Sequence, residues 1–368
     1  MKKLIVIIFL LLSVGTMGWA ATTPRIQLAI LLDTSGSMDG LIGQAKSRLW
    51  KIVNELAAAK KNGLTPQLQV ALYEYGQDSI PATAGHLRCI VPLSNDLDRI
   101  SEELFRLQTN GGQEYCGQVI QAAVGGLEWS GSGGDLKMIV IAGNEPFSQG
   151  VIDYQNSCRE AIARGIIVNT IFCGNFQEGL QTGWKAGADL ADGQYLAIDA
   201  DQTPPPIAAP QDDEIARLNR ELNGTYIAYG KDGSAGKKRQ DEQDKNAAGV
   251  SGEVVAQRAA AKAAPQYSNS AWDLVDAKKT GQVKLEEMAE AELPQEMKGM
   301  SAQERNEYVA ALQGKRETLQ KKIARLHDER ERFVKDKLKN QAAASTLDAA
   351  IIRALRSQAA GKSFRFDK

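Results

Sequence analysis

Apolar and polar residues follow two periodicities along the first half of the chain, one typical of strands and one of helices. Short runs rich in branched apolar residues predict buried strands at residues 26–32, 67–75, 87–93, 136–142, 166–172 and 194–198. Apolar residues at helical spacing predict helices between them, at residues 41–60, 96–107, 116–127, 152–163 and 176–190. Strands that alternate with helices predict an α/β fold over residues 24–200, with a doubly wound, mostly parallel sheet in which the run at 87–93 is an edge hairpin strand.

The second half of the chain has a different pattern. Proline-rich residues 201–211 predict a linker, because proline interrupts both helices and strands. Residues 212–368 are rich in Ala, Gln, Lys, Arg and Glu, and they predict a charged, all-α region that is partly coiled-coil-like. A short helix is expected at residues 212–222, and a final helix is expected to open at Ser345.

A long helix is predicted within this charged region. Ser301 and Glu304 form its capping box, and it runs to about residue 340. Apolar residues recur along it at every seventh position, namely at Leu312, Leu319, Leu326 and Phe333. Such a seam suits a coiled coil with a partner or a second copy. The row beside it is basic, with Arg316, Arg330 and Lys337, and this favours packing within the chain.

Residues 1–20 have the three parts of a secretory signal peptide. Lys2 and Lys3 supply the positive start, residues 4–12 the apolar core, and Ala20 ends a small-residue cleavage site. The apolar run is well short of the ~18 residues that span a bilayer, so no transmembrane segment is expected after cleavage. We therefore expect a periplasmic or secreted protein.

Four cysteines lie in the first half of the chain, at Cys89, Cys116, Cys158 and Cys173. In an oxidising compartment an even number implies disulfides, and expected proximity favours Cys89–Cys116 and Cys158–Cys173, with free buried thiols as the alternative. The chain has no C-x-x-C and only two histidines, which argues against a zinc site. Its net charge of −1 gives no footprint for nucleic acid.

Candidate chemistry lies where the first predicted strand ends. Asp33, Ser35 and Ser37 follow that strand at alternate positions, and α/β sheets place their ligand sites in loops at the carboxyl ends of strands. One carboxylate and two hydroxyls are hard oxygen donors, which suit Mg²⁺ and also Mn²⁺ or Ca²⁺. The alternative is a strand-to-helix turn in which Asp33 and Ser35 cap backbone amides.

The pattern Asp33-x-Ser35-x-Ser37 resembles the first motif of the metal-ion-dependent adhesion site in von Willebrand factor A domains. The order of strands and helices over residues 24–200 resembles that family as well, which has a Rossmann-like sheet. The loop at 111–116 and the strand end at 142–147 resemble those of exported bacterial proteins that carry such a domain and a helical tail.

Two family motifs are altered in this chain. The second motif is a Thr in a glycine-rich loop, and here the two glycines of the loop are followed by Gln113 and Glu114. The third is an Asp after a central strand, and here Gly143 occupies that position and is followed by Asn144 and Glu145. The resemblance therefore implies the fold fully and the metal site in part.

The charge of the metal site decides what the resemblance implies about function. With Asp33 as the only carboxylate ligand beside Ser35 and Ser37, a divalent ion keeps about +1 and attracts an acidic side chain of a partner protein. With Glu114 and Glu145 as further ligands the site is net negative and closed. With no metal, the two glutamates cap helix starts instead. The three alternatives remain open at this point.

An enzymatic function has less support. The loop at Asp33 superficially resembles that of aspartyl phosphatases, but Ser35 replaces their second Asp. A serine nucleophile needs a base, and neither His86, near a strand, nor His327, in the helical half, is an obvious partner. We therefore expect a non-enzymatic module that binds protein, with a helical scaffold on a metal-free α/β support as the alternative.

Overall fold

A six-stranded sheet forms the centre of the first half of the chain. The computed structural model describes residues 23–199, 201, 205–339 and 346–366, so the predicted signal peptide lies outside the described residues. The strands lie in the order β4-β3-β1-β5-β6-β7. Their bounds are β1 Arg25–Asp33, β3 Gln67–Tyr75, β4 Leu87–Ser94, β5 Leu136–Gly143, β6 Ile167–Cys173 and β7 Tyr195–Ile198. Neighbours pair in parallel except β3 and β4, which pair antiparallel. The predicted α/β fold with a hairpin strand at its edge is confirmed.

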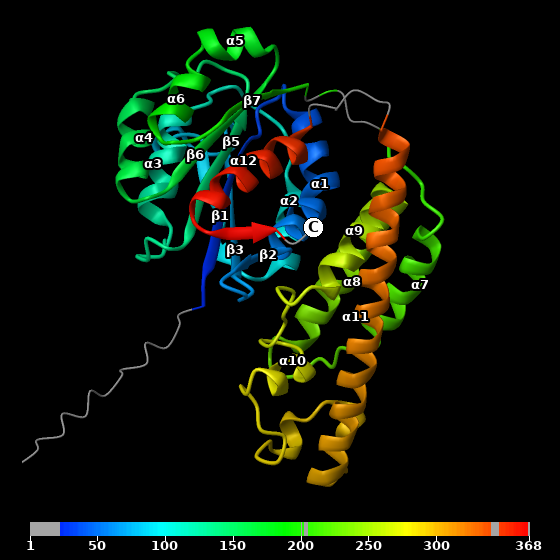
Figure 1. Ribbon diagram of the computed structural model, residues 1–368. Helices are drawn as coiled ribbons and strands as arrows, with labels where there is room; N and C mark the ends of the chain where they lie inside the picture. The colour runs from blue at the N-terminus through cyan, green and yellow to red at the C-terminus, as the bar shows by residue number, and fades with distance from the viewer. Residues whose placement is uncertain (1–22, 200, 202–204, 340–345, 367–368) are drawn as a thin grey trace, which may run out of the picture.

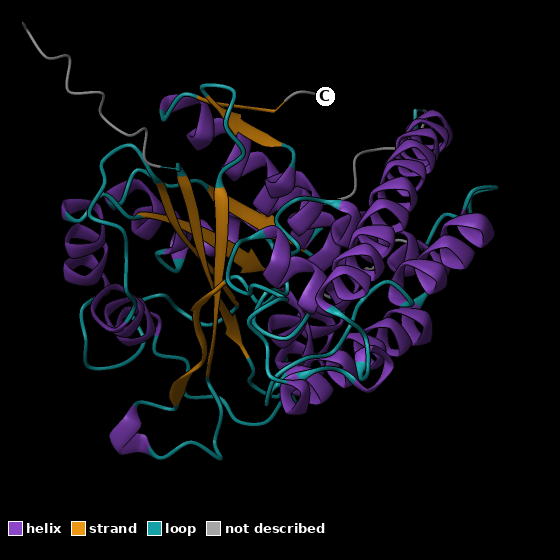
Figure 2. Ribbon diagram, turned by 90° about the horizontal axis from the view of Figure 1, so that it is seen from below, coloured by secondary structure: helices purple, strands orange, loops and turns teal. Residues whose placement is uncertain are grey.

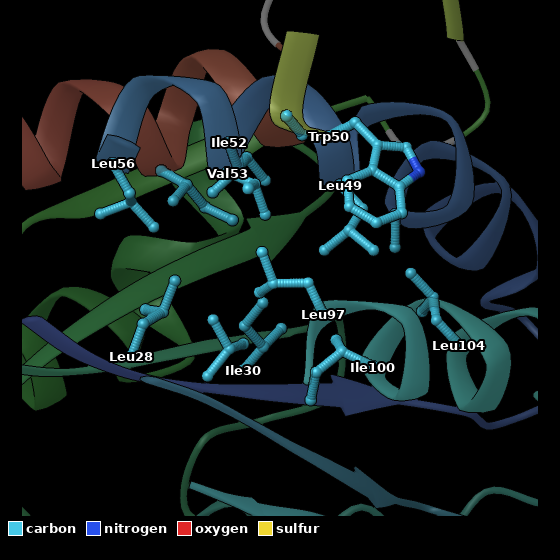
Figure 3. Close-up of a cluster of buried hydrophobic side chains, with 14 of the residues drawn as sticks. Leu28, Ile30, Leu49, Trp50, Ile52, Val53, Leu56, Leu97, Ile100 and Leu104 are labelled. Carbon is cyan, nitrogen blue, oxygen red and sulfur yellow. The ribbon is translucent and has the colours of Figure 1, made fainter. Parts of the chain in front are cut away.

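Helices cover both faces of this sheet (Figures 1 and 2). Successive strand residues point to opposite sides, and apolar side chains on both sides are buried beneath helices. Leu28 and Ile30 of β1 pack toward α1 (Asp39–Ala57) and α2 (Leu97–Arg106), as Figure 3 shows. Ala29 and Leu31 belong to the core on the other face. That core lies under three helices, namely α3 (Cys116–Gly126), α4 (Tyr154–Ala163) and α6 (Trp184–Leu190).

The helix predicted at 176–190 is broken into two. α5 (Phe176–Gln181) ends before Gly183, which has a left-handed φ of +93°, and α6 begins after it. A residue in that conformation cannot continue an α-helix. Periodicity alone therefore located the apolar face of this segment but missed its break.

The second half of the chain forms a stack of helices beside α1 and α2, which we call the helical arm (Figure 1). Its members are α7 Asp212–Asn223, α8 Gly233–Val250, α9 Gly252–Ala263, α10 Leu274–Lys279 and α11 Ala302–Leu338. Short 3₁₀ turns occur at Ala82–Ala84, Glu290–Glu292 and Gln295–Met297. The predicted capping box of Ser301 and Glu304 opens α11. No helix in the described part of the chain is both long enough and apolar enough to cross a membrane.

The long helix α11 packs within the chain, against α7, α9 and α10. Its buried residues include Leu319 and Ile323 and also two of the basic residues that interrupt the heptad seam, Arg316 and Arg330. The packing favoured by the sequence is therefore observed. The arginines face inward because acidic side chains of the arm meet them there, as described below.

The last elements of the chain return to the α/β domain. α12 (Leu347–Gly361) lies beside α1 and covers part of β5, β6 and β7. β8 (Phe364–Phe366) then pairs antiparallel with β2 (Ala59–Lys61), directly after α1. Thr346 is the N-cap of α12, whereas the predicted cap Ser345 lies outside the described residues. Residues at opposite ends of the sequence thus share one layer of the domain.

The predicted disulfides are wrong, because all four cysteines are free thiols. Cys158 belongs to the core beneath α3 and α4, whereas Cys173 packs against the core on the opposite face of the sheet. The expected bond between them would have to cross the sheet.

The other predicted pair, Cys89 and Cys116, is also separated. Cys89 lies opposite Tyr73 in the β3–β4 register, and the Tyr73 hydroxyl donates to the Ala122 carbonyl oxygen. Cys116 lies six residues before Ala122 on α3 and contacts the Tyr75 hydroxyl instead. Six helical residues span about 9 Å. Cys89 and Cys116 therefore lie beside different residues of β3, Tyr73 and Tyr75 respectively.

Candidate metal centre

The loop after β1 holds Asp33 at the carboxyl end of the sheet, between β3 and β5. Asp33 is fully buried, and its Oδ1 accepts a hydrogen bond from the Ser35 amide at 2.7 Å. The loop is fixed by neighbouring backbone, since the Thr34 amide donates to the Tyr75 oxygen at 2.8 Å and the Gly36 amide donates to the Gly111 oxygen at 3.1 Å. The chain therefore presents a rigid carboxylate at the point where the strand order reverses.

Glu114 is the second buried acid of the site, with 2% of its surface exposed. It converges with Asp33 on Gly76, where an added Cβ would lie 2.8 Å from Asp33 Oδ1 and 3.0 Å from Glu114 Cγ. Gly76 also has a left-handed φ of +79°, so glycine is required there on two grounds. The backbone amide of Glu114 donates to Gln149 Oε1 at 2.5 Å, which fixes the loop.

Glu114 disfavours the ionised form of Asp33. The pKa of Asp33 is raised well above its usual value, first by burial and then by a hydrogen bond to Glu114 and by the charge of Glu114. Burial and a like charge both disfavour the ionised form. Such a pair needs either a shared proton or a cation to neutralise it.

Three buried oxygen atoms at this site have no hydrogen-bond partner among the described residues. They are Asp33 Oδ2, Glu114 Oε2 and Asn144 Oδ1. A buried polar atom without a partner is destabilising by roughly 1–3 kcal/mol. All three are hard oxygen atoms, and a divalent cation bound between them would give each of them a partner.

Ser35 and Ser37 complete the set of oxygen donors. Their hydroxyl oxygens lie 3.3 Å apart, and the Asn144 amide nitrogen donates to Ser37 Oγ at 3.3 Å. Ser35 is buried, whereas Ser37 is exposed and lies on the wall of a pocket of about 450 Å³. The candidate centre is therefore closed by protein on the Asp33 side and open on the Ser37 side.

The structure places the two residues after Gly112 differently from one another. Gln113, which follows the two glycines, is exposed and accepts a hydrogen bond from the Tyr115 hydroxyl at 2.8 Å. Its neighbour Glu114 is the residue that faces Asp33.

Tyr75 occupies the space where an Asp at position 143 would extend. A Cβ added at Gly143 would lie 2.4 Å from the Tyr75 hydroxyl oxygen and 3.0 Å from Asp33 Oδ2. The Tyr75 hydroxyl donates to the Ala142 carbonyl oxygen at 2.9 Å. A side chain at position 143 would therefore collide with this tyrosine unless one of the two moved.

Glu145, the remaining predicted ligand, lies at the edge of the site. Its backbone oxygen accepts a hydrogen bond from the Trp184 indole at 2.9 Å. The pKa of Glu145 is raised by partial burial and then by the charges of Glu114 and Glu178. Its carboxylate thus lies within electrostatic range of Glu114. Within the described residues, no group of three His, Cys, Asp or Glu side chains is arranged to hold a metal.

Neither histidine is seen to activate the serines. His86 packs edge-to-face on Tyr115 with ring centroids 5.9 Å apart, and His327 lies on α11 in the helical arm. The Ser35 and Ser37 hydroxyls bond to each other, and Ser37 Oγ also accepts from the Asn144 amide nitrogen. Sequence reasoning missed two members of this site, Asn144 as a donor and Tyr75 as its wall. The only signal for them was their position at the ends of predicted strands.

Comparison with known proteins gives a fold likeness over half of the chain. No family model and no curated protein sequence matches it. Among solved structures, the SpRpn10 VWA domain is 17% identical over 52% of this chain and 95% of its own, with a TM-score of 0.35. BatB from Bacteroides thetaiotaomicron, a conserved hypothetical protein, is 14% identical over 47% of this chain and 90% of its own, with a TM-score of 0.36.

A third similar structure is proximal thread matrix protein 1 from the mussel byssus, whose MIDAS motif is occupied by zinc. It is 11% identical over 49% of this chain and 43% of its own, with a TM-score of 0.36. The present chain therefore spans less than half of the length of the mussel protein.

Proposed function

We propose that this chain is an exported protein-binding module of the von Willebrand factor A type that holds a divalent cation, Mg²⁺ in the first place, at the end of β1. Asp33 and Glu114 would supply carboxylate ligands, Ser35 and Ser37 hydroxyls, and Asn144 an amide oxygen. When bound, the ion supplies a fixed positive charge beside a surface opening, where a partner protein can place an oxygen atom.

The observation that carries this proposal is the set of three partnerless oxygens. Asp33 Oδ2, Glu114 Oε2 and Asn144 Oδ1 come from different loops and are all buried. A shared proton on the two carboxylates is the competing explanation, but it leaves the Asn144 oxygen without a partner. One hard cation accounts for all three.

This donor set also bears on the charge of the site. Glu145 stays at the edge, so a divalent ion would be balanced by the two carboxylates of Asp33 and Glu114. The loaded centre would be close to neutral, between the partner-seeking state at about +1 and the closed negative state. Mn²⁺ and Ca²⁺ suit the same oxygens, with Ca²⁺ demanding more ligands.

Isothermal titration of the full chain with Mg²⁺ and Mn²⁺ tests the metal. We expect one binding event, lost in Asp33→Ala and kept in Asp189→Asn, a matched removal of one exposed carboxylate that pairs with Lys185 on α6. Absence of binding heat with either ion in the wild-type chain, at two temperatures, contradicts the proposal. Capture of a cell-envelope partner that EDTA and Asp33→Ala both abolish tests the binding role.

A second candidate function is that the helical arm is the docking surface and the α/β domain its support. α11 is 37 residues long and only six of its residues are buried, so it offers a long charged face. Lys315 and Lys322 lie on the exposed part of that helix. If Lys315→Glu with Lys322→Glu abolishes capture and Asp33→Ala does not, the arm carries the function.

A further inference from the structure

The small ribbon that β2 and β8 form after α1 carries two basic side chains opposite each other (Figure 1). Lys60 and Arg365 are partners in its antiparallel register. Ala59 and Phe364 are buried on the other side of the ribbon, so the two basic side chains share its outer side. Like charges directly opposite each other on one side of a sheet are destabilising. Such a local conflict with the fold is typical of functional sites.

The same two side chains line a pocket of about 700 Å³. The other described residues of its wall include no acid, and they are Asn62, Gly63, Ala360, Ser363 and Phe364. Asn62 and Ser363 adjoin the two strands and have left-handed φ values of +52° and +61°. This conformation is uncommon outside glycine, and residues held in it cluster at ligand sites. The wall therefore combines two cations with an amide and a hydroxyl group.

Neither cation of this pocket has an acidic partner in the part of the chain that the structure describes. Lys60 Nζ donates to the neutral Thr65 hydroxyl oxygen at 2.5 Å, and no ion pair reaches Arg365. On α1, which precedes the ribbon, Glu55 is engaged by both arms of the Arg356 guanidinium, at 2.6 and 3.0 Å. The repulsion between the two basic side chains is thus not offset by a carboxylate bound between them.

Two more lysines beside the pocket add to its positive charge. Lys61 and Lys362 both donate to carbonyl oxygens of the loop that precedes β5, at residues 134 and 133. Carbonyl oxygens solvate an ammonium group without cancelling its charge. Asp135 of that loop is buried, and its oxygens accept hydrogen bonds from a backbone amide at 2.9 Å and a serine hydroxyl at 2.5 Å. Four cations therefore lie at or next to the pocket, with one buried acid behind them.

We propose that this pocket binds a phosphate group, carried by a small molecule or by a lipid headgroup. The Arg365 guanidinium matches two phosphate oxygens in a fork, and Lys60 supplies a second point charge. A phosphate monoester with two negative charges offsets both cations, whereas a carboxylate offsets one. The pocket is larger than the phosphate and has room for an organic part. It adjoins the loop before β5, at the edge of the sheet opposite the metal centre, so the inference does not rest on the proposed function.

Titration of the full chain with inorganic phosphate, in EDTA and at constant ionic strength, tests the site. We expect binding by calorimetry and a rise in melting temperature. Lys60→Gln and Arg365→Gln should each weaken binding about tenfold, as expected for one lost charge-assisted contact. Arg159→Gln, which removes an exposed arginine from α4, should bind phosphate as the wild type does. Without phosphate, Arg365→Gln should melt no lower than wild type, because it relieves the repulsion.

Cosedimentation with vesicles identifies the source of the phosphate group. Binding to phosphatidylglycerol vesicles but not to phosphatidylcholine vesicles, weakened in Lys60→Gln and Arg365→Gln, assigns it to a lipid headgroup. A response to inorganic phosphate alone, with the same pattern among the variants, assigns it to a soluble ligand. The inference is overturned if neither probe gives a response that depends on these two residues, or if Arg159→Gln weakens binding equally.

Discussion

Buried acids are neutralised in opposite ways in the helical arm and at the end of β1. In the arm, Arg258 contacts Asp98 of α2 at 2.6 Å and also contacts Asp244. At the end of β1, Asp33 and Glu114 face each other, and no ion pair within the described residues reaches either of them. The acids of the arm have basic side chains as partners, whereas the Asp33–Glu114 pair has none among the described residues. This difference distinguishes a structural ion network from a candidate binding site.

The arm's network joins the two halves of the protein, because Arg258 lies on α9 and Asp98 on α2, and it also contains a buried lysine. Lys262 is fully buried and lies 3.0 Å from Asp244, and burial lowers its pKa to about 8. Its folded pKa is below the usual 10.5, so the cost of burying the charged amine is fully present below pH 8. That cost is relieved as the pH rises from 8 toward the unfolded value.

The largest effect should come from removing a counter-charge in the arm. Arg316 lies 2.7 Å from Asp273 and 2.8 Å from Asp276, and all three side chains are buried. Arg316→Met leaves those acids uncompensated and should lower the free energy of unfolding by about 3–5 kcal/mol in urea denaturation. Arg217→Met, which removes an exposed arginine from Glu214, should change it immeasurably. Equal effects of the two variants would mean that the buried network is not stabilising the arm.

The next largest effect should come from supplying the missing counter-charge at the site. Mg²⁺ at one hundred times its dissociation constant should raise the free energy of unfolding by about 2.7 kcal/mol. Asp33→Ala should lose this gain and Arg217→Met should keep it. Thermal unfolding with and without EDTA at constant ionic strength measures both. A gain that survives in Asp33→Ala would place the ion elsewhere.

A smaller, pH-dependent effect follows from the Asp33–Glu114 pair. The raised pKa of Asp33 means that its contribution is most favourable at low pH and is lost as the pH rises from its unfolded value, near 4, through the folded pKa. Glu114→Gln removes the like charge, so in EDTA it should be more stable than wild type at pH 7 by about 1–3 kcal/mol.

The gain of Glu114→Gln over wild type should shrink toward pH 4, and differential scanning calorimetry at several pH values measures it. A difference that does not depend on pH would show that the charge of Glu114 does not raise the pKa of Asp33.

The smallest effect should come from the wall of the site. Tyr75→Phe removes the hydroxyl that donates to the Ala142 oxygen, which should lower the free energy of unfolding by about 1 kcal/mol. The Mg²⁺-induced shift in melting temperature should persist, because that hydroxyl is bonded to backbone. Its loss in Tyr75→Phe would place Tyr75 among the metal donors.

The fold was predicted well because its signal is local. Continuous apolar runs such as 136–142 become strands buried on both faces, and the Ser301–Glu304 box fixes the start of α11. Where the signal was not local, prediction failed. The two disulfides were inferred from expected proximity, but which face of the sheet a cysteine occupies depends on register and on the helix above it.

The sequence by itself determined the α/β pattern, the helical second half and the positions of Asp33, Ser35 and Ser37 at a strand end, because hydrophobic periodicity and strand-end position are properties of short segments. Only the tertiary structure brought Glu114 against Asp33, left Glu145 at the edge and filled the space beside Gly143 with the Tyr75 hydroxyl. Only it turned Arg316 and Arg330 inward toward aspartates of neighbouring helices and loops. Charge balance in a folded protein depends on which loops converge, and that is decided by packing between segments distant in sequence.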